Sequence, residues 1–158
     1  MKDVHHKIQA GIVSWYDAVH GDGMLIAIPN GGPRASVDVR AGDDETAVKA
    51  SRKRAAITAA IRGKQLEAEG VRAGVLDLFL ARPTELRNGI RVCSHRCGLW
   101  VEVKRPDQRG EARGGLTVMQ DLFAAMARLK GYETNVVYTT EEGISAITKY
   151  LGGPTGRR

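Results

Sequence analysis

The chain is poor in cysteine and has no long apolar segment. Two cysteines, Cys93 and Cys97, occur among its 158 residues, too few for the disulfide framework of a small secreted domain. No apolar run approaches the roughly 20 residues that a membrane-spanning helix requires. Residues 1–9 are polar and lack the apolar core of a signal peptide. We therefore expect a cytoplasmic protein with no membrane association.

Acidic residues are fewer than basic ones. The chain has 24 Lys and Arg against 18 Asp and Glu, a net charge of +6 and a pI of about 9.6. This imbalance favours an anionic partner, with nucleic acid ahead of a membrane surface. The length suits one domain with a core large enough to fold by itself. We place this domain at residues 1–151 and a basic tail at residues 152–158.

Cysteine and histidine do not form a recognisable metal motif. Cys93 and Cys97 bracket the polar tip of a predicted hairpin. A closed zinc site needs four ligands, and a fourth ligand is not evident nearby, so free thiols are the simpler interpretation and a zinc site is the alternative. The four histidines lack zinc-ligand spacing, and His5 and His6 are predicted to be surface residues at the start of a helix.

Sequence patterns predict a mixture of helices and strands. Apolar spacing, helix-forming composition and capping residues predict helices over residues 5–20, 46–69, 119–130 and 140–151. The second of these is markedly basic, and Gly63 offers a point at which it divides in two. Short apolar runs predict strands at residues 24–28, 75–80, 90–92, 99–103 and 135–138. This order predicts an α/β domain with a central mixed sheet flanked by helices.

Two of the predicted strands each carry a carboxylate. Asp77 interrupts the apolar run at residues 75–80, and Glu102 interrupts the run at residues 99–103. A buried carboxylate is costly unless it is paired or binds a metal, and one Mg²⁺ between the two would satisfy both. The alternative without metal is an ion pair of either acid with Lys104.

Lys104 and Gln120 extend this pair of acids into a phosphodiester-cleaving arrangement. Lys104 follows Glu102 by two residues, so both side chains lie on the same face of a strand. Its ammonium group can position or deprotonate an attacking water, or neutralise charge in the transition state. Gln120, on the following helix, can orient a water or the scissile phosphate.

Several segments resemble the virus-type replication-repair nuclease (VRR-NUC) family. The resemblance covers most of the chain and is carried by residues 28–34, 66–80 and 99–106, by the helix that Gln120 opens, and by residues 131–132 and the Glu141-Glu142 helix. This family belongs to the PD-(D/E)XK nuclease superfamily. The resemblance implies a restriction-endonuclease-like core in which Asp77, Glu102 and the Val103 carbonyl bind Mg²⁺ or Mn²⁺, Lys104 is catalytic and Gln120 is an accessory site residue.

The chain departs from the family pattern at three places. Leu76 stands where the family usually has a proline before the aspartate. That proline has a backbone role. His5 stands four residues before Gln9, where members often carry a glutamate, so this accessory acid is predicted to be missing. The stretch between Arg34 and Lys64 is longer than expected. We interpret residues 38–62 as a basic helical insertion that contacts DNA or a second subunit.

The resemblance implies a metal-dependent endodeoxyribonuclease acting on branched DNA, and most simply a homodimeric Holliday-junction resolvase. A flap or nicking nuclease is an alternative, and so is a DNA-binding module that has kept the fold without efficient cleavage. Five residues are predicted to contact the DNA backbone: Asn30, Arg34, Lys64, Arg72 and Arg105. For each of them the alternative is an ordinary turn or surface position.

Overall fold

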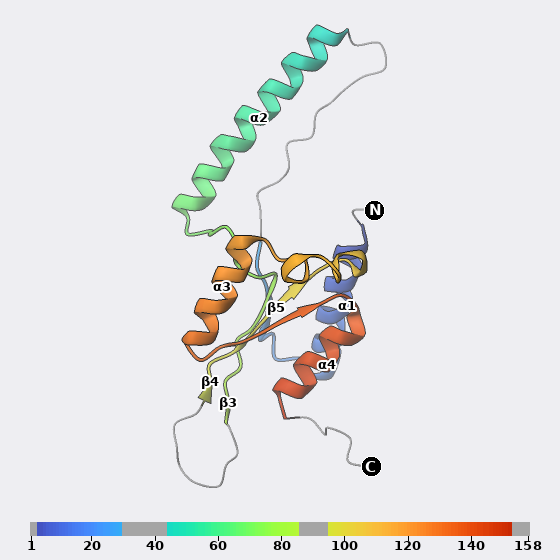
Figure 1. The fold of residues 1–158 in the computed structure, drawn as a ribbon, viewed down its shortest axis with the longest axis vertical. Coiled ribbons are helices and arrows are strands. Elements are labelled where there is room, and N and C mark those ends of the chain that lie inside the picture. The colour runs from blue at the N-terminus through green and yellow to red at the C-terminus, as the bar shows by residue number, and fades with distance from the viewer. Residues whose placement is uncertain (1–2, 30–43, 86–94, 153–158) are drawn as a thin grey trace. The chain divides into compact units, whose positions relative to one another are not determined.

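A computed structural model of the chain describes residues 3–29, 44–85 and 95–152 (Figure 1). The chain forms two compact units, one of residues 1–28 and 74–158 and the other of residues 29–73. The first unit contains α1 (Asp3–Val19), β1 (Leu25–Ala27), β2 (Leu78–Leu80), β3 (Thr84–Glu85), β4 (His95–Arg96), β5 (Leu99–Val103), the 3₁₀ turns η1 (Pro106–Gln108) and η2 (Ala112–Gly115), α3 (Val118–Leu129), β6 (Glu133–Val137) and α4 (Thr140–Tyr150). The second unit contains α2 (Glu45–Ala68).

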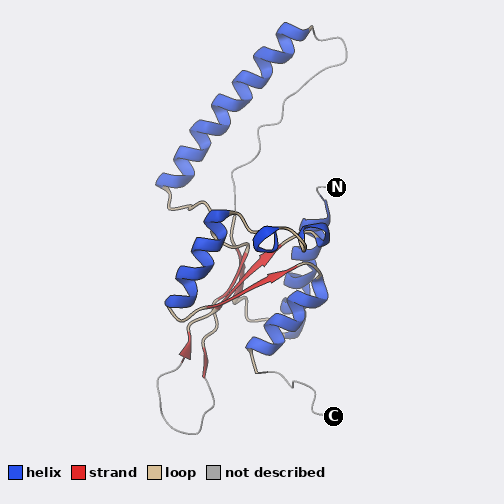
Figure 2. Cartoon of the chain, viewed as in Figure 1, coloured by secondary structure: helices blue, strands red, loops and turns tan. Residues whose placement is uncertain are grey.

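The first unit is built on a mixed four-stranded sheet, as predicted. Its strand order is β1-β2-β5-β6, with β1, β2 and β5 antiparallel and β6 parallel to β5. The short strands β3 and β4 pair separately. Helices α1 and α4 cover one face of the sheet and α3 lies on the other (Figure 2).

The core explains why these segments fold as they do. Alternate residues of β2 and β5 point to the same face, and those on the α1–α4 side are fully buried: Leu78, Leu80, Leu99, Val101 and Val103. They pack against Ile12 and Tyr16 of α1 and Ile147 of α4. On the opposite face Phe79 stacks on Trp100, with ring centroids 4.4 Å apart, and Phe123 of α3 meets Trp100 at 5.0 Å.

Helix α3 differs from an ordinary packed amphipathic helix. Only part of its surface lies on the sheet, with Ala124 and Ala127 buried. Its remaining large apolar residues form a stripe along the helix whose members are between 54% and 86% exposed: Val118, Met119, Leu122, Met126 and Leu129. We call this set the α3 stripe. Contiguous exposed apolar surface of this kind marks interaction sites in soluble proteins.

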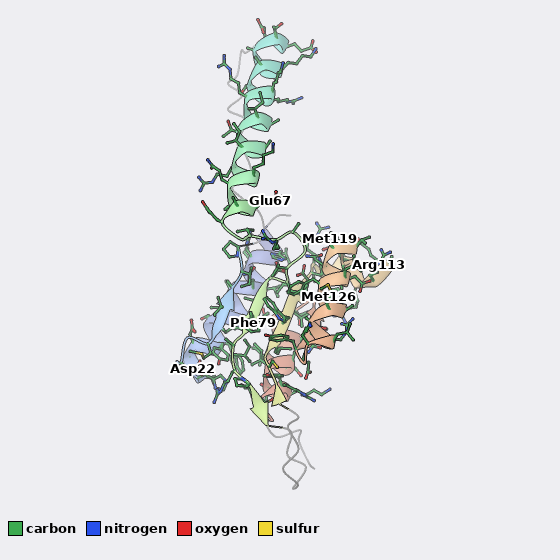
Figure 3. The ribbon with its side chains drawn as sticks, turned by 90° about the vertical axis from the view of Figure 1, so that its left-hand side faces the viewer. Asp22, Glu67, Phe79, Arg113, Met119 and Met126 are labelled. Atoms are coloured by element: carbon green, nitrogen blue, oxygen red, sulfur yellow. The ribbon has the colours of Figure 1, made fainter. Side chains whose placement is uncertain are left out.

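Helix α2 is one continuous helix, so the predicted division at Gly63 is wrong. It is rich in alanine, and one glycine costs only about 1 kcal/mol relative to alanine. Asp44 caps its first turn by accepting from the Ala47 amide at 2.6 Å. Gly70, at φ 97°, follows its end in the left-handed region. None of its side chains is buried, and they extend from all sides of the helix (Figure 3).

Some predictions concern residues outside the described ranges. They include the strand at residues 90–92, Cys93, residues 38–43 of the expected insertion and residues 153–158 of the expected basic tail. Cys97 is a free, exposed thiol. Within the described ranges, no helix combines the length and apolarity needed to cross a bilayer.

Candidate active site

Asp77 and Glu102 lie side by side at one end of the sheet. Asp77 directly precedes β2, and the antiparallel register that pairs Leu78 with Val101 places it opposite Glu102. Both are buried, at 7% and 1% exposure. Asp77 Oδ2 accepts a hydrogen bond of 3.0 Å from the Val103 amide, which ties the aspartate to β5. The two acids that were predicted from separate apolar runs are thus brought together.

The Glu102 carboxylate has two different oxygens. Oε1 accepts from Lys104 Nζ at 2.8 Å and from Gln120 Nε2 at 2.5 Å. Oε2 is buried and has no hydrogen-bond partner among the described residues. Burial, and then the nearby charge of Asp77, raise the pKa of Glu102 to about 7, although Lys104 and the backbone amide of Asp77 act in the opposite direction. A buried carboxylate oxygen without a donor is costly, and a bound cation would remove that cost.

Gln120 is fixed by the start of α3. Thr117 is the N-cap, and its hydroxyl accepts from the Gln120 amide at 3.2 Å. In return, Gln120 Oε1 accepts from the Thr117 amide and from Lys104 Nζ, both at 3.0 Å. The side chain therefore directs its oxygen to two donors and its nitrogen to Glu102. The Thr-x-x-Gln capping box was available in the sequence as a signal for this role, but it was not identified.

His5 is the residue beside the two acids whose position the sequence analysis misjudged. It was expected on the surface, but its Nε2 lies 3.1 Å from Asp77 Oδ2 and its side chain is 30% exposed. The hydrogen bond to Asp77 raises the pKa of His5, against an opposing effect of partial burial. The position of His5, where the family that the sequence resembles often has a glutamate, was the available signal. His6 is exposed, as predicted.

The predicted DNA contacts fall in different places. Asn30 and Arg34 lie outside the described residues. Arg105 forms an ion pair with Asp107 at 3.1 Å. Lys64 and Arg72 belong to the second unit, where Lys64 is exposed on α2 and Arg72 donates to the Glu67 carbonyl at 2.7 Å, near the end of that helix.

The arrangement suits a hard divalent cation. No group of three or more His, Cys, Asp or Glu side chains in the described part of the chain stands ready to hold a metal. Two carboxylates are nevertheless sufficient for Mg²⁺, which uses few protein ligands and keeps several waters. The unpartnered Oε2 of Glu102, a residue that the strand register places opposite Asp77, is the observation that fits such an ion.

Comparison with known proteins supports the fold. Neither family models nor curated proteins give a match to the chain. Among solved structures, a VRR_NUC domain protein is similar, with a TM-score of 0.59 and 16% sequence identity over 94% of this chain and 88% of that chain. At this identity the likeness is one of fold. The chain therefore has a VRR-NUC-like fold, as the resemblance of its motifs predicted.

Proposed function

We propose that the chain is a metal-dependent endonuclease that hydrolyses phosphodiester bonds in DNA. The observation that carries this proposal is the Glu102 carboxylate, which is opposite Asp77, contacts Lys104 through one oxygen and leaves the other buried without a donor. The similarity to a VRR_NUC domain protein supports a nuclease-type domain. Asp77, Glu102 and the Val103 carbonyl would hold Mg²⁺ or Mn²⁺.

The chemistry is divided among the residues of the site. When bound, the metal supplies a coordinated water of lowered pKa and neutralises phosphate charge. Lys104 is 12% exposed beside Glu102, so its ammonium group is shielded from bulk water and placed to orient the attacking water or to stabilise negative charge on the phosphate. Gln120 keeps Lys104 and Glu102 in fixed orientation through its amide.

We also propose that the protein acts as a homodimer on branched DNA. The α3 stripe is an exposed apolar surface on the same helix as Gln120, and a second copy of the stripe is its natural partner because a two-fold interface uses the same patch twice. A two-fold dimer carries two sites, which suits the two symmetric cuts that resolve a four-way junction.

A DNA-binding module without cleavage is the second candidate. It is favoured by the contacts that each acid already makes without metal, namely the ion pair of Glu102 Oε1 with Lys104 and the His5–Asp77 hydrogen bond. A nuclease that cuts flaps or nicks duplex DNA would use the same site on a different substrate.

The deciding experiment incubates the protein with a synthetic four-way junction, a flap and plain duplex, with Mg²⁺, with Mn²⁺ and with EDTA. We expect metal-dependent cutting of the junction in paired positions, and a dimer in sedimentation velocity. Binding without cutting in either metal would leave the binding module as the function. Cutting of flaps but not of junctions would exclude a resolvase, and a monomer would contradict the dimer.

The basic residues of α2 give a separate prediction. Changing Arg52, Lys53 and Arg54 to glutamine should weaken DNA binding and reduce its salt dependence, because each lost phosphate contact removes roughly 0.9 from the log–log salt slope. All three are exposed on α2. Binding is measured by fluorescence anisotropy over a salt series. The matched control removes equal charge from the first unit by changing Arg128, Lys130 and Lys149 to glutamine. An equal salt slope in both variants would mean that α2 does not contribute to DNA binding.

A further inference from the structure

The His5 imidazole reaches Asp77 from α1, an element separate from the strands beside which the two acids lie. His5 lies in the first turns of α1, whereas Asp77 and Glu102 belong to the sheet region. The helix is anchored by Ile8 and Ile12, which are 8% and 0% exposed. These residues follow His5 by three and seven positions, so all three side chains lie on the same face of the helix. Core packing of α1 therefore holds the imidazole beside Asp77.

The distance between the two groups is compatible with a shared metal. His5 Nε2 and Asp77 Oδ2 are 3.1 Å apart. Ligand atoms bind a small octahedral dication at about 2.1 Å, so two neighbouring ligands are separated by roughly 3.0 Å. The described His, Asp and Glu side chains do not yet form a three-ligand set. Metal binding would therefore exchange the His5–Asp77 hydrogen bond for one bond from each group to the ion.

We propose that His5 is a third protein ligand of the metal, through Nε2, and that it makes the site prefer a transition-metal dication such as Mn²⁺ over Mg²⁺. This inference rests on the proposed metal site at Asp77 and Glu102. Imidazole nitrogen binds first-row transition metals well, whereas Mg²⁺ favours an all-oxygen set. A glutamate at this position would supply oxygen instead, so the residue at position 5 sets the metal preference of the site.

Pulsed electron paramagnetic resonance of bound Mn²⁺ tests the proposal without any measurement of cleavage. The intact protein is titrated with Mn²⁺, and modulation from a coordinated imidazole nitrogen is expected in the spectrum. His5→Gln and His5→Glu should remove the modulation, whereas His6→Gln should retain it, since His6 is exposed. Calorimetric titration with each metal should show that His5→Glu lowers the ratio of Mn²⁺ affinity to Mg²⁺ affinity, because a carboxylate oxygen replaces the imidazole nitrogen.

The outcomes separate this inference from the proposed function. Mn²⁺ that binds the wild type, is lost in Asp77→Asn and shows no imidazole nitrogen would overturn the role of His5 and leave the metal site in place. Mn²⁺ that binds Asp77→Asn as tightly as the wild type would overturn both. A nitrogen signal that persists in His5→Gln would assign the ligand to another histidine and contradict the proposal.

Discussion

Lys104→Ala is expected to reduce the cleavage rate roughly a thousandfold, the usual effect of removing a group that stabilises charge or transfers a proton in a transition state. Its Nζ is held 2.8 Å from Glu102 Oε1 and 3.0 Å from Gln120 Oε1. The alanine variant loses the only ammonium group that the described structure places on the Glu102 carboxylate. DNA binding should change little, because one phosphate contact at most is lost.

Single-turnover cleavage at saturating protein measures the effect, and anisotropy under the same conditions measures binding. Lys104→Met is the matched variant, since it retains most of the apolar stem and removes the charge. Lys130→Ala, an exposed lysine of the same unit, is the control that should cut normally. A rate within tenfold of the wild type in both Lys104 variants would remove Lys104 from the mechanism and point to another general base.

The strand part of the site was predictable because its signals are local. An acid inside an apolar run predicts a buried carboxylate, and the two-residue spacing of Glu102 and Lys104 fixes their common face. The antiparallel pairing that sets Asp77 opposite Glu102 was not required to identify them. The fold followed from the same runs, because their order along the chain leaves few arrangements of a mixed sheet.

The helical part of the site was less accessible from sequence. His5 is held beside Asp77 by the packing of Ile8 and Ile12 in the core, which no local pattern specifies. Apolar spacing in α3 identified an amphipathic helix, but it could not show that the apolar stripe would face solvent. Gly63 does not break α2, because its local cost of about 1 kcal/mol is offset by the good helix formers around it.

The pH dependence of stability offers a test of the site that needs neither DNA nor metal. The pKa of Glu102 is raised from 4.5 to about 7 in the folded protein. At pH values between these two, the folded state therefore retains a proton that the unfolded state has lost. Unfolding free energy therefore falls as pH rises through this window. One pKa unit corresponds to about 1.4 kcal/mol, so the loss for Glu102 is on the order of 3 kcal/mol.

Glu102→Gln should remove most of this slope. Glutamine keeps an oxygen for Lys104 and Gln120 to contact and does not titrate. His5 contributes a slope of the same sign, because its raised pKa gives stability that is present below 6.5 and is lost as pH rises through the folded value. Glu102→Gln should therefore still lose some stability as pH rises. The unfolding free energy of the double variant His5→Gln/Glu102→Gln should change little with pH.

Urea denaturation of the metal-free protein in EDTA, at intervals across the titration range, measures these slopes. Glu111→Gln replaces an exposed glutamate of the same unit and should reproduce the wild-type curve. A wild-type stability that does not fall between pH 4.5 and pH 7 would mean that Glu102 is not buried beside Asp77 as described. Because the same burial creates the unpartnered oxygen on which the proposed metal site rests, that result would also remove the principal support for a nuclease site.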